Sequence, residues 1–167
     1  MELQKRKRSR LQSFDYSSCG AYFVTICTAD RRKILSRIDR GDPCGRPNVT
    51  LSEIGEIVQR NIFEIENRYD FLVDHYVIMP DHVHLLLVRT DERATARVAP
   101  TVGQAVGALK SLSVRDWRVI CSQRGQIMGK TWQRNYYEHI IRNDQDLAET
   151  RRYIEDNPIQ WLEDRHG

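Results

Sequence analysis

The chain has 167 residues, of which 40% are hydrophobic and 29% are charged. This length suits a single domain with a substantial core, and no apolar run is long enough to cross a bilayer. The composition is therefore that of a globular protein and disfavours a membrane partner. The formal net charge of +3 permits a polyanionic partner without requiring one.

Positive charge is concentrated at the N-terminus, where no apolar pattern would fold the segment into a core. A secretory signal would continue into an apolar segment, but residues 11–16 are mixed and polar. The four cysteines lack a Cys-x-x-Cys pair, which fits reduced thiols in the cytoplasm better than disulfides or a zinc site. We expect residues 1–18 to form a basic arm, either a solvated tail or a flexible clamp on phosphates, and residues 19–167 to form one domain. The basic residues of this arm are Lys5, Arg6, Lys7, Arg8 and Arg10.

Apolar periodicity predicts four strands and two helices between residues 21 and 141. Thr50 and Glu53 form a capping-box pattern ahead of an apolar stripe that predicts a helix to about Asn67. Residues 40–48 carry two glycines and two prolines and predict a loop. The β-α-β-β-α-β order predicts an α+β, ferredoxin-like antiparallel sheet with both helices on one face. The predicted strands are residues 21–28, 71–79, 82–88 and 132–141, and the second helix is residues 102–120.

The third strand carries His82-Val83-His84 directly after a turn at Met79-Pro80-Asp81. Side chains alternate faces along a strand, so the two imidazoles would project from the same side and could bind one ion. Apolar residues follow at both odd and even positions, so both faces of this strand are apolar. This favours a central strand that is covered on both faces. The alternative is a pair of ordinary histidines.

A further helix is predicted after Asn143, which is a preferred N-cap residue type, and Pro158 should end it. Within it Tyr153 and Asn157 stand four residues apart and share a face. If that face overlooks the histidines, a divalent ion could be held by two imidazoles and an amide oxygen, beside a phenol able to attack phosphorus. A half-buried helix tyrosine without chemistry is the alternative.

Three motifs in this order resemble the HUH single-tyrosine transposases, and in particular the REP-associated tyrosine transposases. The resemblance runs from about Tyr22 to Trp161. It rests on His82-Val83-His84, on Trp132-Gln133-Arg134-Asn135-Tyr136-Tyr137-Glu138-His139-Ile140-Ile141-Arg142-Asn143, and on Tyr153-Ile154-Glu155-Asp156-Asn157-Pro158.

The resemblance implies a nucleoid-associated enzyme that cuts hairpin-bearing single-stranded DNA with Mg²⁺ or Mn²⁺ and without an organic cofactor. It would keep the 5′ end on a tyrosine and act as a monomer or a homodimer. His82 and His84 match the metal ligands of the family, Tyr153 the nucleophile and Asn157 the third ligand. Insertion-sequence members commonly have glutamine at that last position, so asparagine favours the REP-associated branch.

Several other residues are candidates for supporting roles. Tyr136 and Tyr137 compete with Tyr153, but neither has a polar ligand one helical turn away. DNA contacts are expected from Lys110, Arg134 and His139, although a plain structural role for His139 is equally open. Two rival functions also stay open: a nucleic-acid-binding module without cleavage, and a metal-dependent phosphodiesterase that uses activated water.

Overall fold

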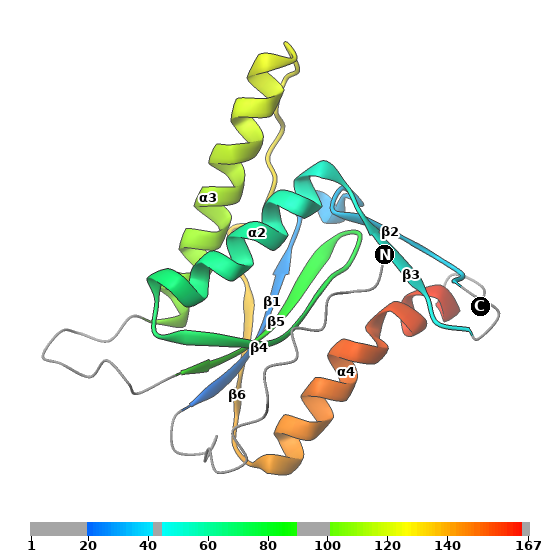
Figure 1. The fold of residues 1–167 in the computed structure, drawn as a ribbon, viewed down its shortest axis with the longest axis vertical. Coiled ribbons are helices and arrows are strands. Elements are labelled where there is room, and N and C mark those ends of the chain that lie inside the picture. The colour runs from blue at the N-terminus through cyan, green and yellow to red at the C-terminus, as the bar shows by residue number, and fades with distance from the viewer. Residues whose placement is uncertain (1–19, 42–44, 90–100, 165–167) are drawn as a thin grey trace, which may run out of the picture.

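A computed structural model describes residues 20–41, 45–89 and 101–164 of the chain, so the expected basic arm lies outside the described residues. Figure 1 shows the arrangement of the elements. In chain order they are β1 (Ala21–Cys27), the 3-10 turn η1 (Ala29–Arg31), β2 (Ser36–Asp39), β3 (Asn48–Leu51), α2 (Glu53–Arg68), β4 (Phe71–Ile78), β5 (His82–Arg89), α3 (Val102–Gln123), β6 (Tyr137–Ile141) and α4 (Asp144–Glu163).

The main sheet has four strands in the order β4-β5-β1-β6, and each adjacent pair is antiparallel. The predicted hairpin connects β4 to β5, and the Met79 amide donates to the His82 carbonyl across it at 2.8 Å. With α2 after β1 and α3 after β5, this is the predicted ferredoxin-like arrangement, which is confirmed. The strand with the histidines is central, as its apolar pattern predicted, and it is buried from His82 to Val88.

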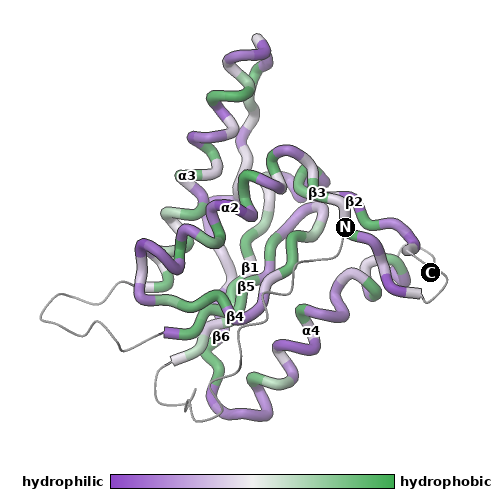
Figure 2. The backbone as a smooth tube through the Cα atoms, in the orientation of Figure 1, coloured by the Kyte–Doolittle hydropathy of each residue, from purple (hydrophilic) through white to green (hydrophobic). Residues whose placement is uncertain are grey.

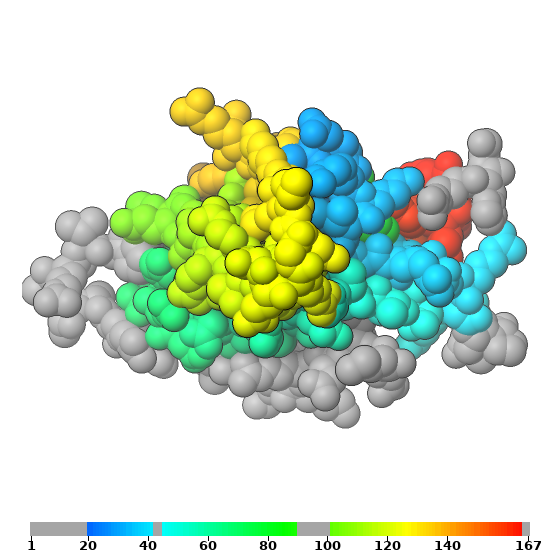
Figure 3. Space-filling model, turned by 90° about the horizontal axis from the view of Figure 1, so that it is seen from above, coloured from blue at the N-terminus to red at the C-terminus, as the bar shows by residue number. Residues whose placement is uncertain are grey.

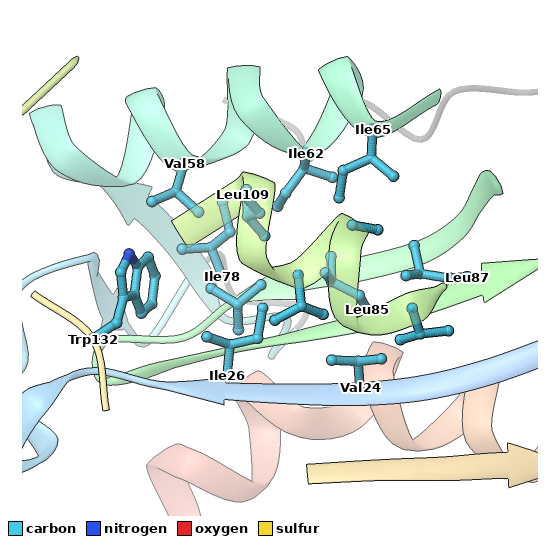
Figure 4. Close-up of a cluster of buried hydrophobic side chains, with 14 of the residues drawn as sticks. Val24, Ile26, Val58, Ile62, Ile65, Ile78, Leu85, Leu87, Leu109 and Trp132 are labelled. Carbon is cyan, nitrogen blue, oxygen red and sulfur yellow. The ribbon is translucent and has the colours of Figure 1, made fainter. Parts of the chain in front are cut away.

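The two faces of the sheet have separate cores. On one face, α2 and α3 pack on residues of odd number in β5, such as Leu85 and Leu87, and on Val24 and Ile26 of β1 (Figure 4). The opposite face is covered by α4, whose Leu147 and Ile154 join a second cluster. Figure 2 shows hydrophobic stretches of the sheet strands between these layers, and hydrophilic stretches along α4. The two helices of the ferredoxin-like core therefore share one face, and the C-terminal helix lies on the other.

A short hairpin between β1 and α2 was missed from the sequence. Strands β2 and β3 pair antiparallel, from Ser36 opposite Leu51 to Asp39 opposite Asn48. Thr50 is part of β3 and is not the helix cap that the capping-box pattern predicted. Ser52 caps α2 instead, because its hydroxyl accepts from the Gly55 amide at 3.1 Å.

Two predicted boundaries were also wrong. Strand β6 begins only at Tyr137, and Trp132 makes an isolated bridge to Thr28. Helix α4 continues through Pro158 to Glu163 although proline removes a backbone donor. Pro158 is buried, and the turns beyond it pack Trp161 and Leu162 against the second cluster. This burial offsets the cost of the proline, a tertiary effect that local propensity does not contain.

Candidate active site

The histidine pair lies on the face of the sheet that α4 covers. His82 and His84 occupy even-numbered positions of β5, on the same face as Leu86 and Val88 of the second cluster. Leu85 and Leu87 point to the other face. Both histidines are buried, and their Nε2 atoms lie 3.0 Å apart. The strand alternation used in the prediction therefore brings the two imidazoles together at one point.

The Nδ1 atom of each imidazole contacts a neighbouring side chain. His82 Nδ1 lies 2.6 Å from Asp81 Oδ1, and His84 Nδ1 lies 2.8 Å from Thr25 Oγ1 on the neighbouring strand. The carboxylate can only accept, so His82 carries its proton on Nδ1 and presents a lone pair at Nε2. The threonine hydroxyl can donate or accept, so His84 can either donate its Nε2 proton to His82 or present a second lone pair.

Burial keeps both histidines neutral. It lowers the pKa of His82, although hydrogen bonds with Asp81 and Asn157 oppose this effect. Burial, followed by the charge that His82 would carry when protonated and by the charge of Arg31, lowers the pKa of His84 to about 3. Neutral imidazole is the form that binds a metal, so the pair is ready as a ligand set at neutral pH.

Tyr153 and Asn157 reach the same place from α4. The Tyr153 ring lies 5.3 Å from the His84 ring and 5.8 Å from the Phe23 ring, centroid to centroid, and the residue is 43% exposed. Asn157 is buried, and its side chain raises the pKa of His82, which places the amide beside that imidazole. The helix is started by Asn143, whose side chain accepts from the Asp146 amide at 2.8 Å, as predicted. The phenol is accessible, and the amide is held at the imidazoles.

The donor set fits a divalent ion. Two cis ligands, each about 2.1 Å from an octahedral ion, stand about 3.0 Å apart, which matches the separation of the two Nε2 atoms. The described residues contain no group of three or more His, Cys, Asp or Glu side chains able to hold a metal. A third protein ligand would thus be the Asn157 amide oxygen, which leaves other positions for substrate oxygens.

Three residues at this site were not singled out from the sequence. Asp81 stands directly before His82, and this adjacency was a usable signal. Thr25 and Arg31 come from β1 and the turn after it, far along the chain. Arg31 forms an ion pair with Asp81, with 3.1 Å between Nε and Oδ2. No local pattern could identify them, because the pairing of β1 with β5 brings Thr25 to His84 and the turn after β1 brings Arg31 to Asp81.

The expected DNA contacts lie apart from one another. Lys110 donates to the carbonyls of Gln133, Arg134 and Asn135 at 2.9, 3.2 and 3.1 Å, so its ammonium holds the segment before β6. The Arg134 side chain is exposed. His139 lies on β6 with its Nε2 3.0 Å from both carboxylate oxygens of Asp146. A role in binding DNA stays a prediction for all three residues, and the arm from Lys5 to Arg10 lies outside the described residues.

The rival tyrosines face opposite sides of the sheet. Tyr136 packs against the cluster under α2 and α3, and its hydroxyl donates to Glu138 at 3.2 Å. Tyr137 lies on the histidine face, 59% exposed, with its ring centroid 6.5 Å from that of Phe23. The structure gives Tyr153, and neither rival, a ring contact with His84.

The fold and the site together define a ferredoxin-like domain with a histidine pair facing a tyrosine on a C-terminal helix. A sequence model of the family described as "Transposase IS200 like" matches residues 16–157, and the chain belongs to this family of transposases. The chain is 27% identical over 179 residues to an uncharacterized protein of Haemophilus influenzae, an alignment that covers 98% of this chain and 93% of the relative. A second H. influenzae protein, provisionally named a REP-associated tyrosine transposase, is 29% identical over 160 residues, covering 87% of this chain and 74% of the relative.

Two solved structures share the fold. One is a REP-associated tyrosine transposase bound to a REP hairpin, with a TM-score of 0.57 and 17% identity over 85% of this chain and 68% of the other. The second is a transposase-like protein of Deinococcus radiodurans, with a TM-score of 0.51 and 21% identity over 81% and 88% of the two chains. No helix in the described parts of this chain has the length and apolarity needed to span a membrane.

Proposed function

We propose that this transposase-family protein cleaves single-stranded DNA beside a hairpin and joins strands through a covalent link to Tyr153. The observation that carries the proposal is the convergence of the two Nε2 atoms, 3.0 Å apart, next to the ring of Tyr153. The hairpin as partner is supported by the related fold that is bound to a REP hairpin. Mg²⁺ or Mn²⁺ is the proposed cofactor.

The chain's own residues would prepare the site for a dianionic transition state. His82, His84 and Asn157 would hold the ion, which supplies charge neutralisation at phosphorus when it is bound. Asp81 and Thr25 fix the orientation of the imidazoles. Because Tyr153 is 43% exposed, a DNA strand can approach its hydroxyl without opening the core.

The proposed step is an in-line substitution at phosphorus. The Tyr153 Oη forms a bond to phosphorus while the bond from phosphorus to the 3′ oxygen breaks. The phenolic proton passes to water, and the departing 3′ oxygen takes up a proton from water. The products are a 5′-phosphotyrosine and a free 3′ hydroxyl, and the reverse step with a different 3′ hydroxyl would join new strands.

The decisive experiment uses a labelled single strand that contains a hairpin, incubated with the full chain and Mg²⁺ or Mn²⁺. Denaturing electrophoresis separates a protein–DNA adduct, a free cut product and intact DNA. We expect an adduct that EDTA, His82→Ala or His84→Ala abolishes, while DNA binding persists. A cut product without adduct would instead favour the water-dependent phosphodiesterase, and intact DNA would favour the non-catalytic binding module.

A further inference from the structure

The turn after β1 holds an arginine beside the histidine pair in a strained backbone. Asp30 and Arg31 both have positive φ angles, 55° and 53°, in the left-handed region that residues other than glycine seldom adopt. Such conformations cost free energy and persist only where the surroundings enforce them, which is common at functional sites.

Thr28 fastens this turn to the start of the histidine strand. Its amide and its hydroxyl both lie within hydrogen-bond distance of the Asp81 carbonyl oxygen, at 2.9 and 3.0 Å. The Arg31 amide then donates to the Thr28 carbonyl at 3.2 Å. The strained turn is therefore held against the residue that orients His82.

The guanidinium of Arg31 is fixed on one side and open on the other. Nε pairs with Asp81 Oδ2 at 3.1 Å, and Nη1 contacts Cys27 Sγ at 2.8 Å. Among the described residues Nη2 has no hydrogen-bond partner, and the side chain is 51% exposed. Figure 3 shows the segment after β1, in blue, at the surface of the molecule.

The two basic residues that follow Arg31 do not place a cation beside Asp81. Arg32 donates to the Lys130 carbonyl. The Lys33 ammonium lies over the Trp161 ring, 5.5 Å from its centroid. Of these three consecutive basic residues, Arg31 is the one joined to Asp81, which also holds His82. The charge of Arg31 also contributes to the lowered pKa values of both histidines, in agreement with this proximity.

We propose that Arg31 binds a non-bridging oxygen of the scissile phosphate through its open Nη2 edge, and this assignment rests on the function proposed above. Arginine suits the role because its planar fork can keep Asp81 on one edge while it donates to a phosphate on another. Asp81 would then align two groups at once: an imidazole of the metal pair and the cation that holds the reacting phosphate. Strain in the turn preorganises the guanidinium before DNA arrives.

The test measures phosphate contacts without cleavage. The probe is a DNA stem–loop with single-stranded flanks, in which methylphosphonate replaces one phosphate at a time and removes its charge. Binding is followed by fluorescence anisotropy in EDTA for the wild-type chain, Arg31→Gln, Arg31→Lys and Arg37→Gln. Arg37 serves as the matched control because it is exposed on β2 and pairs with Asp39.

We expect methylphosphonate at one position to weaken the binding of the wild-type chain about 10-fold relative to unmodified DNA. Arg31→Gln should bind this modified DNA as tightly as it binds unmodified DNA. Arg31→Lys, which keeps the charge opposite Asp81, should retain a smaller loss at that same position, and Arg37→Gln should match the wild type. The assignment is overturned if folded Arg31→Gln and Arg31→Lys respond to every position as the wild type does. The binding test needs no cleavage, so its outcome is separate from that of the adduct assay. If the phosphate effect depends on Arg31 but no adduct forms, Arg31 binds a DNA phosphate and only the cleavage proposal is refuted.

Discussion

Arg151 of α4 donates two hydrogen bonds to Asp74 of β4, from Nε to Oδ2 at 2.7 Å and from Nη2 to Oδ1 at 2.8 Å. This bidentate pair is largely buried, with exposed side-chain fractions of 21% for Arg151 and 12% for Asp74. His75 adds a further contact to the same carboxylate, 2.8 Å from Nδ1 to Oδ2. Tyr153 stands two residues after Arg151 in the same helix, so the pair holds α4 against β4 close to the proposed nucleophile.

Removing this anchor should loosen α4. Arg151→Met leaves a buried carboxylate without its cation, and we expect the free energy of unfolding to fall by on the order of 3 kcal/mol. Adduct formation should decrease more than DNA binding, because Tyr153 loses its position. Urea denaturation and the adduct assay measure the two effects. Arg152→Met, an exposed neighbour, is the control, and an equal effect of both variants would show that the Asp74 pair has no special part.

The same carboxylate predicts a pH dependence of stability. Burial would raise the pKa of Asp74, but the hydrogen bonds from His75 and Arg151 outweigh it and lower the pKa to about 2. As pH falls below the ordinary value near 3.8, the unfolded chain takes up this proton first, so the stabilisation is lost between about pH 4 and pH 2. We expect the unfolding free energy of Asp74→Asn to depend less steeply on pH in this window than that of the wild type. Identical slopes would contradict the shift.

Tyr153→Phe should eliminate the covalent adduct while DNA binding survives. The substitution removes one oxygen and keeps the ring contacts with His84 and Phe23. Tyr136→Phe and Tyr137→Phe are the matched controls and should keep the adduct, detected by denaturing electrophoresis. An adduct that persists in Tyr153→Phe and disappears in Tyr137→Phe would transfer the nucleophile to β6.

The partners of the imidazoles should set the metal requirement. Thr25→Val removes the hydroxyl that contacts His84 Nδ1, and we expect the Mn²⁺ concentration for half-maximal adduct formation to rise about 10–100-fold. Asn157→Ala should raise it similarly, since two histidines can still hold an ion loosely. Thr50→Val, at an exposed position of β3, should leave it unchanged. A Thr25→Val protein with wild-type Mn²⁺ dependence would show that the hydroxyl does not support a metal ligand.

Deleting residues 1–10 should weaken DNA binding and flatten its salt dependence. Each phosphate neutralised on a single strand contributes about 0.7 to the slope of log affinity against log salt concentration, so the loss of slope counts the phosphates that the arm contacts. Binding titrations at several salt concentrations measure this slope for the full and the shortened chain. An unchanged slope would show that the arm is a solvated tail that does not contact phosphates.

The sequence by itself determined the order of the main elements and the alternation that puts His82 and His84 on one side of a central strand. Both follow from local periodicity, which is strong where a strand or helix buries a complete face. The four-residue spacing of Tyr153 and Asn157 is likewise a property of any helix. Local signals failed at the β2–β3 hairpin and at Pro158, where packing decides the outcome.

Only the tertiary structure decided what surrounds the histidine pair. That α4 covers the histidine face follows from the second core cluster and from the pair of Arg151 with Asp74, which are 77 residues apart in the chain. Thr25 reaches His84 through antiparallel register across 59 residues, and Arg31 reaches Asp81 through the turn at the end of β1. Contacts between side chains so distant in sequence depend on how strands pair and helices pack, and that information is not contained in the period of any one segment.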